Sequence, residues 1–124
     1  MALALGIYLS LSISKGVTTV SSALQKIALG DVNAEVHIES ADEVGDMARS
    51  YGEMRQYLIE TVESANRIGN GDLTVNVKPK SESDALGNAY VQMVGNLRSL
   101  ISQVRTTADS LGGALIYYVV KSVR

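Results

Sequence analysis

One sequence pattern occurs twice in this chain and limits the folds that the chain can adopt. Residues 30–45 read GDVNAEVHIESADEVG, and residues 71–87 read GDLTVNVKPKSESDALG. Each copy opens with Gly-Asp-apolar, has another apolar residue four positions after that one, and closes with Asp-x-apolar-Gly. Repeats of this length can form solenoids, but two copies are too few for a solenoid. The chain is therefore expected to contain two related units.

The segments that flank the two copies have the heptad spacing of coiled-coil helices. Apolar residues recur there mostly at steps of three and four, which places them on one narrow stripe of a helix. We call this stripe the seam. In chain order the seam consists of Val17, Val20, Leu24, Ile27, Val44, Met47, Tyr51, Met54, Leu58, Leu86, Tyr90, Met93, Leu97, Leu100, Val104 and Leu111. The spacing predicts three helices, of which the middle one belongs to both units.

The expected helix ends follow from local sequence signals. Gly30 suits the position just past a helix end, where the backbone often turns left-handed. Ser40 and Glu43 have the spacing of a capping box, so the second helix is expected to begin near Ser40. Ser81 or Ser83 is expected to cap the third helix.

The two segments between the helices are expected to be extended connectors. Residues 31–39 alternate apolar and polar side chains, which normally indicates a strand. However, a strand without a partner cannot complete a hydrogen-bonded ladder, and Pro79 disfavours pairing in residues 72–82. The connector side chains expected to plug the grooves between helices are Val32, Val36, Leu73 and Val77.

The length of the connectors sets the direction of the helices. Ten extended residues reach about 33 Å, whereas a helix of about 16 residues is about 24 Å long. A connector can therefore return along the whole helix, and the next helix then runs parallel to the first. Two such helices still leave part of each seam exposed. The predicted fold is thus all-α, with two helix–connector–helix units, each forming a parallel four-helix coiled-coil bundle as a homodimer.

These features together resemble the HAMP domain, a signal-relay module of bacterial and archaeal transmembrane receptors. The first unit carries the motif residues Gly30, Asp31, Val32, Val36, Asp42, Glu43, Val44 and Gly45, and the second carries Gly71, Asp72, Leu73, Val77, Asp84, Leu86 and Gly87. Lys15-Gly16 stands where the family often has a proline, and Ala85 replaces the motif Glu of the second unit.

The resemblance implies roles for two sets of residues. The signal-relay and packing set is Gly30, Val32, Val36, Glu43, Gly45, Gly71, Leu73, Val77, Leu86 and Gly87. The dimer-core set is Val20, Leu24, Ile27, Val44, Met47, Tyr51, Met54, Leu58, Met93, Leu97, Leu100 and Val104. The implied function is relay of movement from a membrane helix to an output coiled coil, as in methyl-accepting chemotaxis proteins.

The expected organisation has four segments. Residues 1–13 are interpreted as the end of a truncated transmembrane helix, because their apolar run is too short to cross a membrane alone. A buried soluble helix and a signal peptide are the other interpretations of this run. Residues 14–58 and 59–104 are the two HAMP-like units. Residues 105–124 begin an output coiled coil, in which Gly112 and Gly113 are expected to interrupt the helix.

The composition favours a protein without catalytic chemistry. The chain has no Cys, which excludes disulfides, thiolate metal sites and a Cys nucleophile. His37 is the one histidine and is interpreted as a solvated connector residue. The acidic residues around positions 42 and 84 are interpreted as helix-start residues. We expect no enzyme activity, no cofactor and no metal, and the net charge of −2 gives no basic footprint for nucleic acid.

Partners, location and alternatives follow from the same interpretation. The expected partners are a second copy of the chain, the membrane through the N-terminal helix, and downstream signalling proteins through an output domain. The units are expected on the cytoplasmic side of the cell membrane. The alternatives are the HAMP linker of a sensor histidine kinase, and a soluble structural bundle with no signalling role. The ligand sensed, the output domain and the direction of signalling are not predicted.

Overall fold

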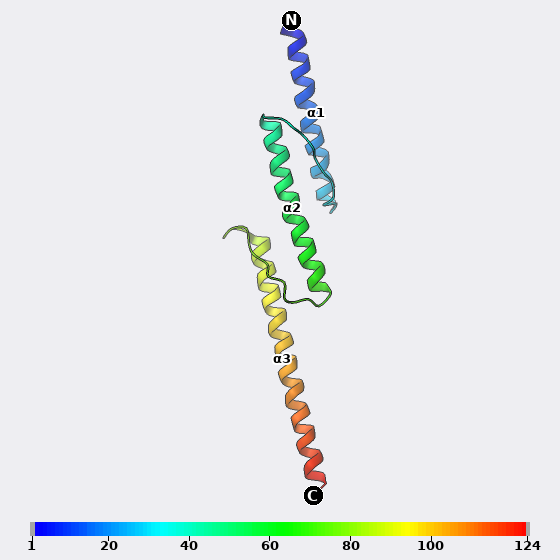
Figure 1. Ribbon diagram of the computed structural model, residues 1–124, viewed down its shortest axis with the longest axis vertical. Coiled ribbons are helices and arrows are strands. Elements are labelled where there is room, and N and C mark those ends of the chain that lie inside the picture. The colour runs from blue at the N-terminus through cyan, green and yellow to red at the C-terminus, as the bar shows by residue number, and fades with distance from the viewer. Residues whose placement is uncertain (1, 124) are drawn as a thin grey trace. The chain divides into compact units, whose positions relative to one another are not determined.

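The computed structural model describes residues 2–123, and this part of the chain contains helices and no strands. The helices are α1 (Ala2–Ala28), α2 (Glu43–Gly69) and α3 (Ala85–Ser122). Extended segments join them (Figure 1). The predicted all-α order of helix, connector and helix is confirmed. Met1 and Arg124, at the outer ends of the first and last predicted segments, lie outside the described residues.

The chain divides into two compact units, residues 1–63 and residues 64–124, which are described separately. The end of the first helix in each unit has the same geometry. Gly30 has φ 89° and Gly71 has φ 85°, the left-handed conformation that glycine adopts without strain. The amide of Gly30 donates to the carbonyl of Ile27 at 2.8 Å, and the amide of Asp31 donates to Lys26 at 3.0 Å. This is a Schellman motif, and it confirms Gly30 as the stop signal.

The helix starts differ from the prediction. Helix α2 begins at Glu43, and the Asp42 carboxylate accepts from the amides of Val44 and Gly45 at 3.0 and 3.2 Å. The predicted capping box at Ser40 is therefore wrong, because a carboxylate that faces the free amides is a stronger acceptor than a hydroxyl two residues away.

Helix α3 likewise has an aspartate cap. Asp84 accepts from the amide of Gly87 at 2.8 Å, whereas the hydroxyls of Ser81 and Ser83 bond to each other at 3.0 Å. The prediction of a serine cap is wrong here too. The predicted interruption at residues 112–113 is also wrong, since α3 continues through both glycines. Each glycine costs only about 0.5–1 kcal/mol in a helix, which is too little to break it.

The core of the first unit lies between α1, α2 and the connector. Val20 and Ala23 of α1 and Ala48 and Tyr51 of α2 are buried. Four half-buried residues pack against this cluster: Ile27, Val36, Ile38 and Met54. Val44, at the start of α2, lies against Gly16, far upstream in α1. Contacts therefore advance along both helices together, and α1 and α2 are parallel, as Figure 1 shows.

The connector of the first unit is extended without being a strand. The side chains of Val32, Ala34, Val36 and Ile38 are half-buried, and the residues between them are exposed. The alternation in the sequence thus corresponds to one face turned toward the helices, as predicted. In the second unit the buried residues are Val75 of the connector and Gly87 and Val94 of α3.

Candidate functional site

The last residue of each repeated pattern is a glycine over which the connector passes. A Cβ atom on Gly45 would overlap the carbonyl oxygen of Ser40 and lie 2.8 Å from its carbonyl carbon. A Cβ atom on Gly87 would lie 2.9 Å from Cα of Pro79. In the structure, the connector backbone is what needs the space.

The aspartates of the closing motif hold this crossing together. Besides capping α3, the Asp84 carboxylate accepts from the backbone amide of Lys80 at 2.8 Å, so it bonds to both the connector and the helix. In the first unit, a hydrogen bond from the Ser40 hydroxyl lowers the pKa of Asp42, and the Gly45 amide adds to the effect. Both carboxylates accept hydrogen bonds from backbone amides, which makes Asp-x-apolar-Gly a joint between connector and helix.

The aspartates of the opening motif shape the turn into each connector. Asp31 accepts from the amide of Asn33 at 3.0 Å, and Asp72 accepts from the amide of Thr74 at 2.9 Å. The Thr74 hydroxyl donates to Asp72 at 2.6 Å, and Arg67 forms an ion pair with it at 2.6 Å. The Thr74 hydroxyl and the Arg67 guanidinium lower the pKa of Asp72 to about 2. Glycine supplies the left-handed turn, and aspartate closes the next one.

Two arginines that sequence analysis missed bind the connector backbone. In the first unit, Arg55 Nε donates to the carbonyl of Val32 at 2.9 Å. In the second unit, Arg98 donates to the carbonyls of Leu73 and Val75 at 2.7 and 2.9 Å. A signal was available, because each arginine ends a Gly-x-x-Arg stretch in the second helix of its unit.

Tyr51 makes a further bond between helix and connector. Its ring is buried in the core of the first unit, and its hydroxyl donates to the carbonyl of Ala34 at 2.7 Å. The seam spacing placed Tyr51 in the core, but nothing in that spacing predicted the hydrogen bond.

The predicted dimer-core residues differ in burial within one chain. Three of them are buried: Val20, Val44 and Tyr51. Four are half-buried: Ile27, Met54, Leu58 and Leu97. Five are exposed: Leu24, Met47, Met93, Leu100 and Val104. Leu24 and Met47 line an open groove of about 390 Å³ between α1 and α2, together with Val20, Tyr51 and Met54. Val94, which sequence analysis did not select, is only 3% exposed. One face of the seam is therefore packed within the chain, and another is open.

The predicted relay residues also occupy distinct places. The glycines that the connectors pass over, Gly45 and Gly87, are buried. Four members are half-buried on the connectors: Val32, Val36, Leu73 and Val77. Two glycines, Gly30 and Gly71, follow helix ends, and two exposed residues, Glu43 and Leu86, lie in the first turns of α2 and α3. The structure thus brings the connector members of this set against their own helices.

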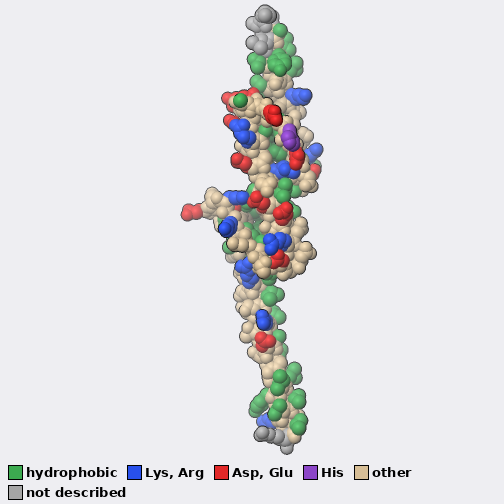
Figure 2. All heavy atoms as spheres, viewed as in Figure 1, with side chains coloured by type: hydrophobic (Ala, Val, Ile, Leu, Met, Phe, Trp, Pro, Cys, Tyr) green, Lys and Arg blue, Asp and Glu red, His purple; other side chains and the backbone are tan. Residues whose placement is uncertain are grey.

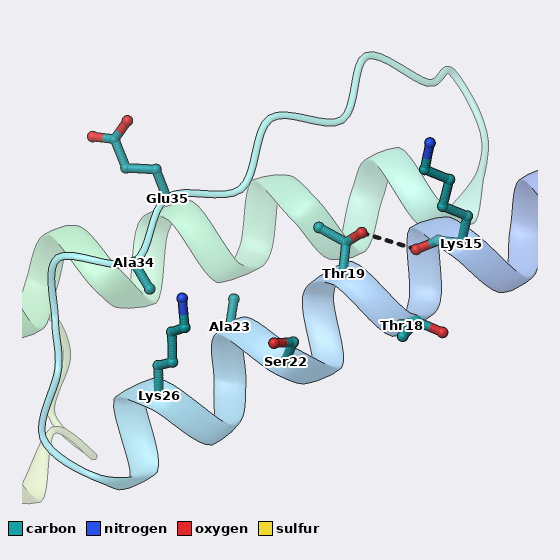
Figure 3. A pocket seen from close by; sticks show the side chains of 8 residues that line it. All are labelled: Lys15, Thr18, Thr19, Ser22, Ala23, Lys26, Ala34 and Glu35. Atoms are coloured by element: carbon teal, nitrogen blue, oxygen red, sulfur yellow. Dashed lines mark hydrogen bonds between the residues drawn. The ribbon is translucent and has the colours of Figure 1, made fainter.

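A second groove, of about 480 Å³, lies between α1 and the first connector (Figure 3). Lys15 and Lys26 flank it, Ala23 and Ala34 face each other across it, and Glu35 points away from the helix. The Thr18 and Thr19 hydroxyls donate to carbonyls of the preceding helical turn. This groove has a mixed polar and apolar lining, unlike the largely apolar groove beside Leu24.

Exposed apolar side chains also gather along residues 7–13 of α1 and in the last turns of α3 (Figure 2). Tyr8 and Tyr118, for example, are 70% and 71% exposed. Nevertheless, within residues 2–123 no helix has the length and apolar character needed to cross a membrane. The same residues contain no group of three or more His, Cys, Asp or Glu side chains that is placed to hold a metal ion.

Comparison with known proteins agrees with this geometry. Residues 8–60 and residues 58–99 each match the HAMP domain. A protein of Acetivibrio thermocellus named "Putative sensory transducer protein" is 36% identical over 104 residues, which cover 84% of this chain and 19% of that protein. The chain thus spans about a fifth of that relative's length. No solved structure matches the chain. Because the matched stretches cover most of the chain and each contains one copy of the repeated pattern, the chain belongs to the HAMP domain family, as a tandem pair of HAMP domains.

Proposed function

We propose that this chain is a signal relay of a transmembrane transducer and acts as a homodimer. Each unit pairs with its counterpart to form a parallel four-helix bundle. Movement of a membrane helix that enters at α1 changes the packing of the first bundle, and the change passes to an output coiled coil that continues α3. The chain itself carries out no chemical reaction.

The observation that carries the proposal is the half-covered seam of the first unit. Val17, Leu24 and Met47 are 40%, 42% and 41% exposed, although they alternate with seam residues that are buried. The groove beside them has an apolar floor formed by Val20, Tyr51 and Met54. A second copy of the chain would present the same helical spacing to this groove, which is the usual way in which heptad seams are covered.

The side chains around the groove are suited to two packing arrangements. Met47 and Met54 are flexible and fill spaces of different shape at low cost. Gly52, in the middle of α2, adds no side chain, and a helical glycine costs about 0.5–1 kcal/mol relative to alanine. A relay needs two arrangements that differ by only a few kcal/mol, and a soft seam supports this.

The placement in a receptor rests on the family and the relative. HAMP domains are modules of membrane receptors, and the similar Acetivibrio thermocellus protein is named as a sensory transducer. We infer that the units lie on the cytoplasmic side of the cell membrane and serve a chemotaxis-type pathway. The output region would contact the downstream signalling proteins.

Disulfide cross-linking tests the homodimer directly, because the chain has no native cysteine. We expect Leu24→Cys to form a bridge between two copies under mild oxidation. Ser22→Cys is the matched control, since it is exposed on the same helix two residues away and lines the groove between α1 and the first connector instead. Cross-linking at Leu24 but not at Ser22 supports the dimer. A folded chain that sediments as a monomer at micromolar concentration and bridges at neither position contradicts it.

A further inference from the structure

We propose that Arg55 and Arg98 are positioning residues that fix each connector against the second helix of its unit. Nothing in the family match assigns them a role, and they lie outside the repeated pattern. We call the hydrogen bonds from each arginine to its connector the clamp. The clamp does not depend on the proposed relay, but its consequence for signalling rests on that function: a clamped connector and helix would move together when the first helix is displaced.

Each arginine makes one equivalent contact to its connector. Arg55 binds the carbonyl of Val32, and Arg98 binds the carbonyl of Leu73. Val32 and Leu73 occupy the same place in their units, two residues after the left-handed glycine. Each arginine also reaches a second acceptor. Arg98 donates to the carbonyl of Val75 at 2.9 Å, and Arg55 forms an ion pair with Glu35 at 3.3 Å.

A connector needs donors of this kind because it forms no sheet. Its backbone carbonyls have no ladder partner, yet its apolar side chains draw the backbone close to the helices. A guanidinium has several N–H donors in a fixed plane and can bind two neighbouring carbonyls at once. The Arg55 side chain is only 21% exposed, so its bonds are partly shielded from water.

The spacing of the two units gives independent support. In the first unit, ten positions separate Val32 from the helix cap Asp42, and thirteen separate Asp42 from Arg55. In the second unit, the corresponding separations, from Leu73 to Asp84 and from Asp84 to Arg98, are eleven and fourteen. The connector and the stretch from the cap to the arginine are thus each longer by one residue in the second unit. Despite the added residues, each arginine binds the carbonyl of the equivalent connector residue, Val32 or Leu73. This is expected if the helix cap and the arginine hold the two ends of the connector against the helix.

Spin labels on the connectors test the clamp in the full chain. A single label is attached at Asn76→Cys in the second connector or at His37→Cys in the first, both of which are exposed sites. We expect Arg98→Met to raise the ratio of mobile to immobile label at position 76 about tenfold, as loss of charged hydrogen bonds predicts. The label at position 37 should not respond. Arg55→Met should raise the ratio of mobile to immobile label at position 37 and leave the label at position 76 unchanged.

Two further variants separate the clamp from general loss of stability. Arg105→Met removes an exposed arginine of α3 for which the described structure records no hydrogen bond or ion pair, so neither label should respond. Arg98→Lys keeps the charge but cannot span two carbonyls, so its effect at position 76 should be intermediate.

Two kinds of result would overturn the proposal. If Arg98→Met leaves the label at position 76 unchanged while circular dichroism shows a folded helix, Arg98 does not hold the connector. If Arg98→Met mobilises both labels equally, or Arg105→Met acts as strongly, the arginine contributes only general stability. These readouts lie within one chain, so they can fail or succeed whether or not cross-linking at Leu24 supports the homodimer.

Discussion

Tyr51 donates a hydrogen bond of 2.7 Å to the carbonyl oxygen of Ala34, and so joins the buried core of the first unit to its connector. Replacing Tyr51 with Phe keeps the ring but leaves the Ala34 carbonyl without this donor. We expect a loss of about 0.5–1.5 kcal/mol in the free energy of unfolding. Thermal denaturation at fixed protein concentration measures it. Tyr90→Phe is the control, because no hydrogen bond is recorded for Tyr90 in the described structure; equal losses in the two variants would contradict the prediction.

Gly45→Ala should destabilise the first unit strongly, because its Cβ atom would overlap the Ser40 carbonyl. Backbone atoms cannot move aside as a flexible side chain can, so we expect a loss of about 1–3 kcal/mol or more. The matched control is Gly52→Ala in the same helix, where a Cβ atom meets open space. That change should stabilise by about 0.4–1 kcal/mol, since alanine restricts the unfolded chain. Urea denaturation compares the two, and the same sign for both would refute the interpretation.

The cap of α3 is assigned to Asp84 rather than to a serine. Asp84→Ala should therefore reduce the free energy of unfolding by about 0.5–2 kcal/mol, because the amide of Gly87 loses its acceptor. Ser81→Ala and Ser83→Ala should have smaller effects, since their hydroxyls bond to each other on the surface. Helix content by circular dichroism and thermal denaturation both report the difference. If a serine variant lost as much stability as Asp84→Ala, the cap would have to be assigned to that serine instead.

Asp72 should give the second unit a dependence on acid. The Thr74 hydroxyl and Arg67 hold its pKa at about 2 in the folded chain, below the ordinary value of 3.8. The folded state therefore binds the proton less readily than the unfolded state. The resulting stabilisation is complete above about pH 4 and is lost as the pH falls from about 4 through about 2.

Thermal denaturation of the wild-type chain and of Asp72→Asn across pH 2–6 measures this effect. The two should differ most above about pH 4 and converge toward pH 2. Added salt should reduce the part that depends on the partly exposed Arg67. Asp109→Asn, on the exposed part of α3, is the control. If the difference in stability between the wild-type chain and Asp72→Asn were independent of pH, the charge of the Asp72 carboxylate would not be the cause of the stabilisation.

The sequence predicted the order of elements because periodicity and glycine placement are local signals. The seam of residues such as Val20 and Tyr51 indicated helices, and Gly30 indicated where the first helix ends. The alternation around Val36 was correctly interpreted as an extended connector, since no second strand was present to pair with it. Each of these conclusions depends on residues close together in the chain.

The errors arose where two nearby groups compete for the same role. Ser40 fits a capping box, but the Asp42 carboxylate is closer to the free amides and carries a charge. Gly112 and Gly113 weaken a helix, yet their cost is small against the bonds of the 38-residue helix α3. The bonds of Arg55 and Arg98 to the connectors could not be derived from periodicity, because they join residues 23 to 25 positions apart.

Helix α2 begins in the last residues of the first repeated pattern and ends just before the second. The boundary between the two units, at residues 63 and 64, therefore lies inside α2, and neighbouring units need no dedicated linker between them. Gene duplication over this period of 41 residues, from Gly30 to Gly71, would append another module by extending a helix that already exists. Longer arrays could arise in this way without inventing any new junction.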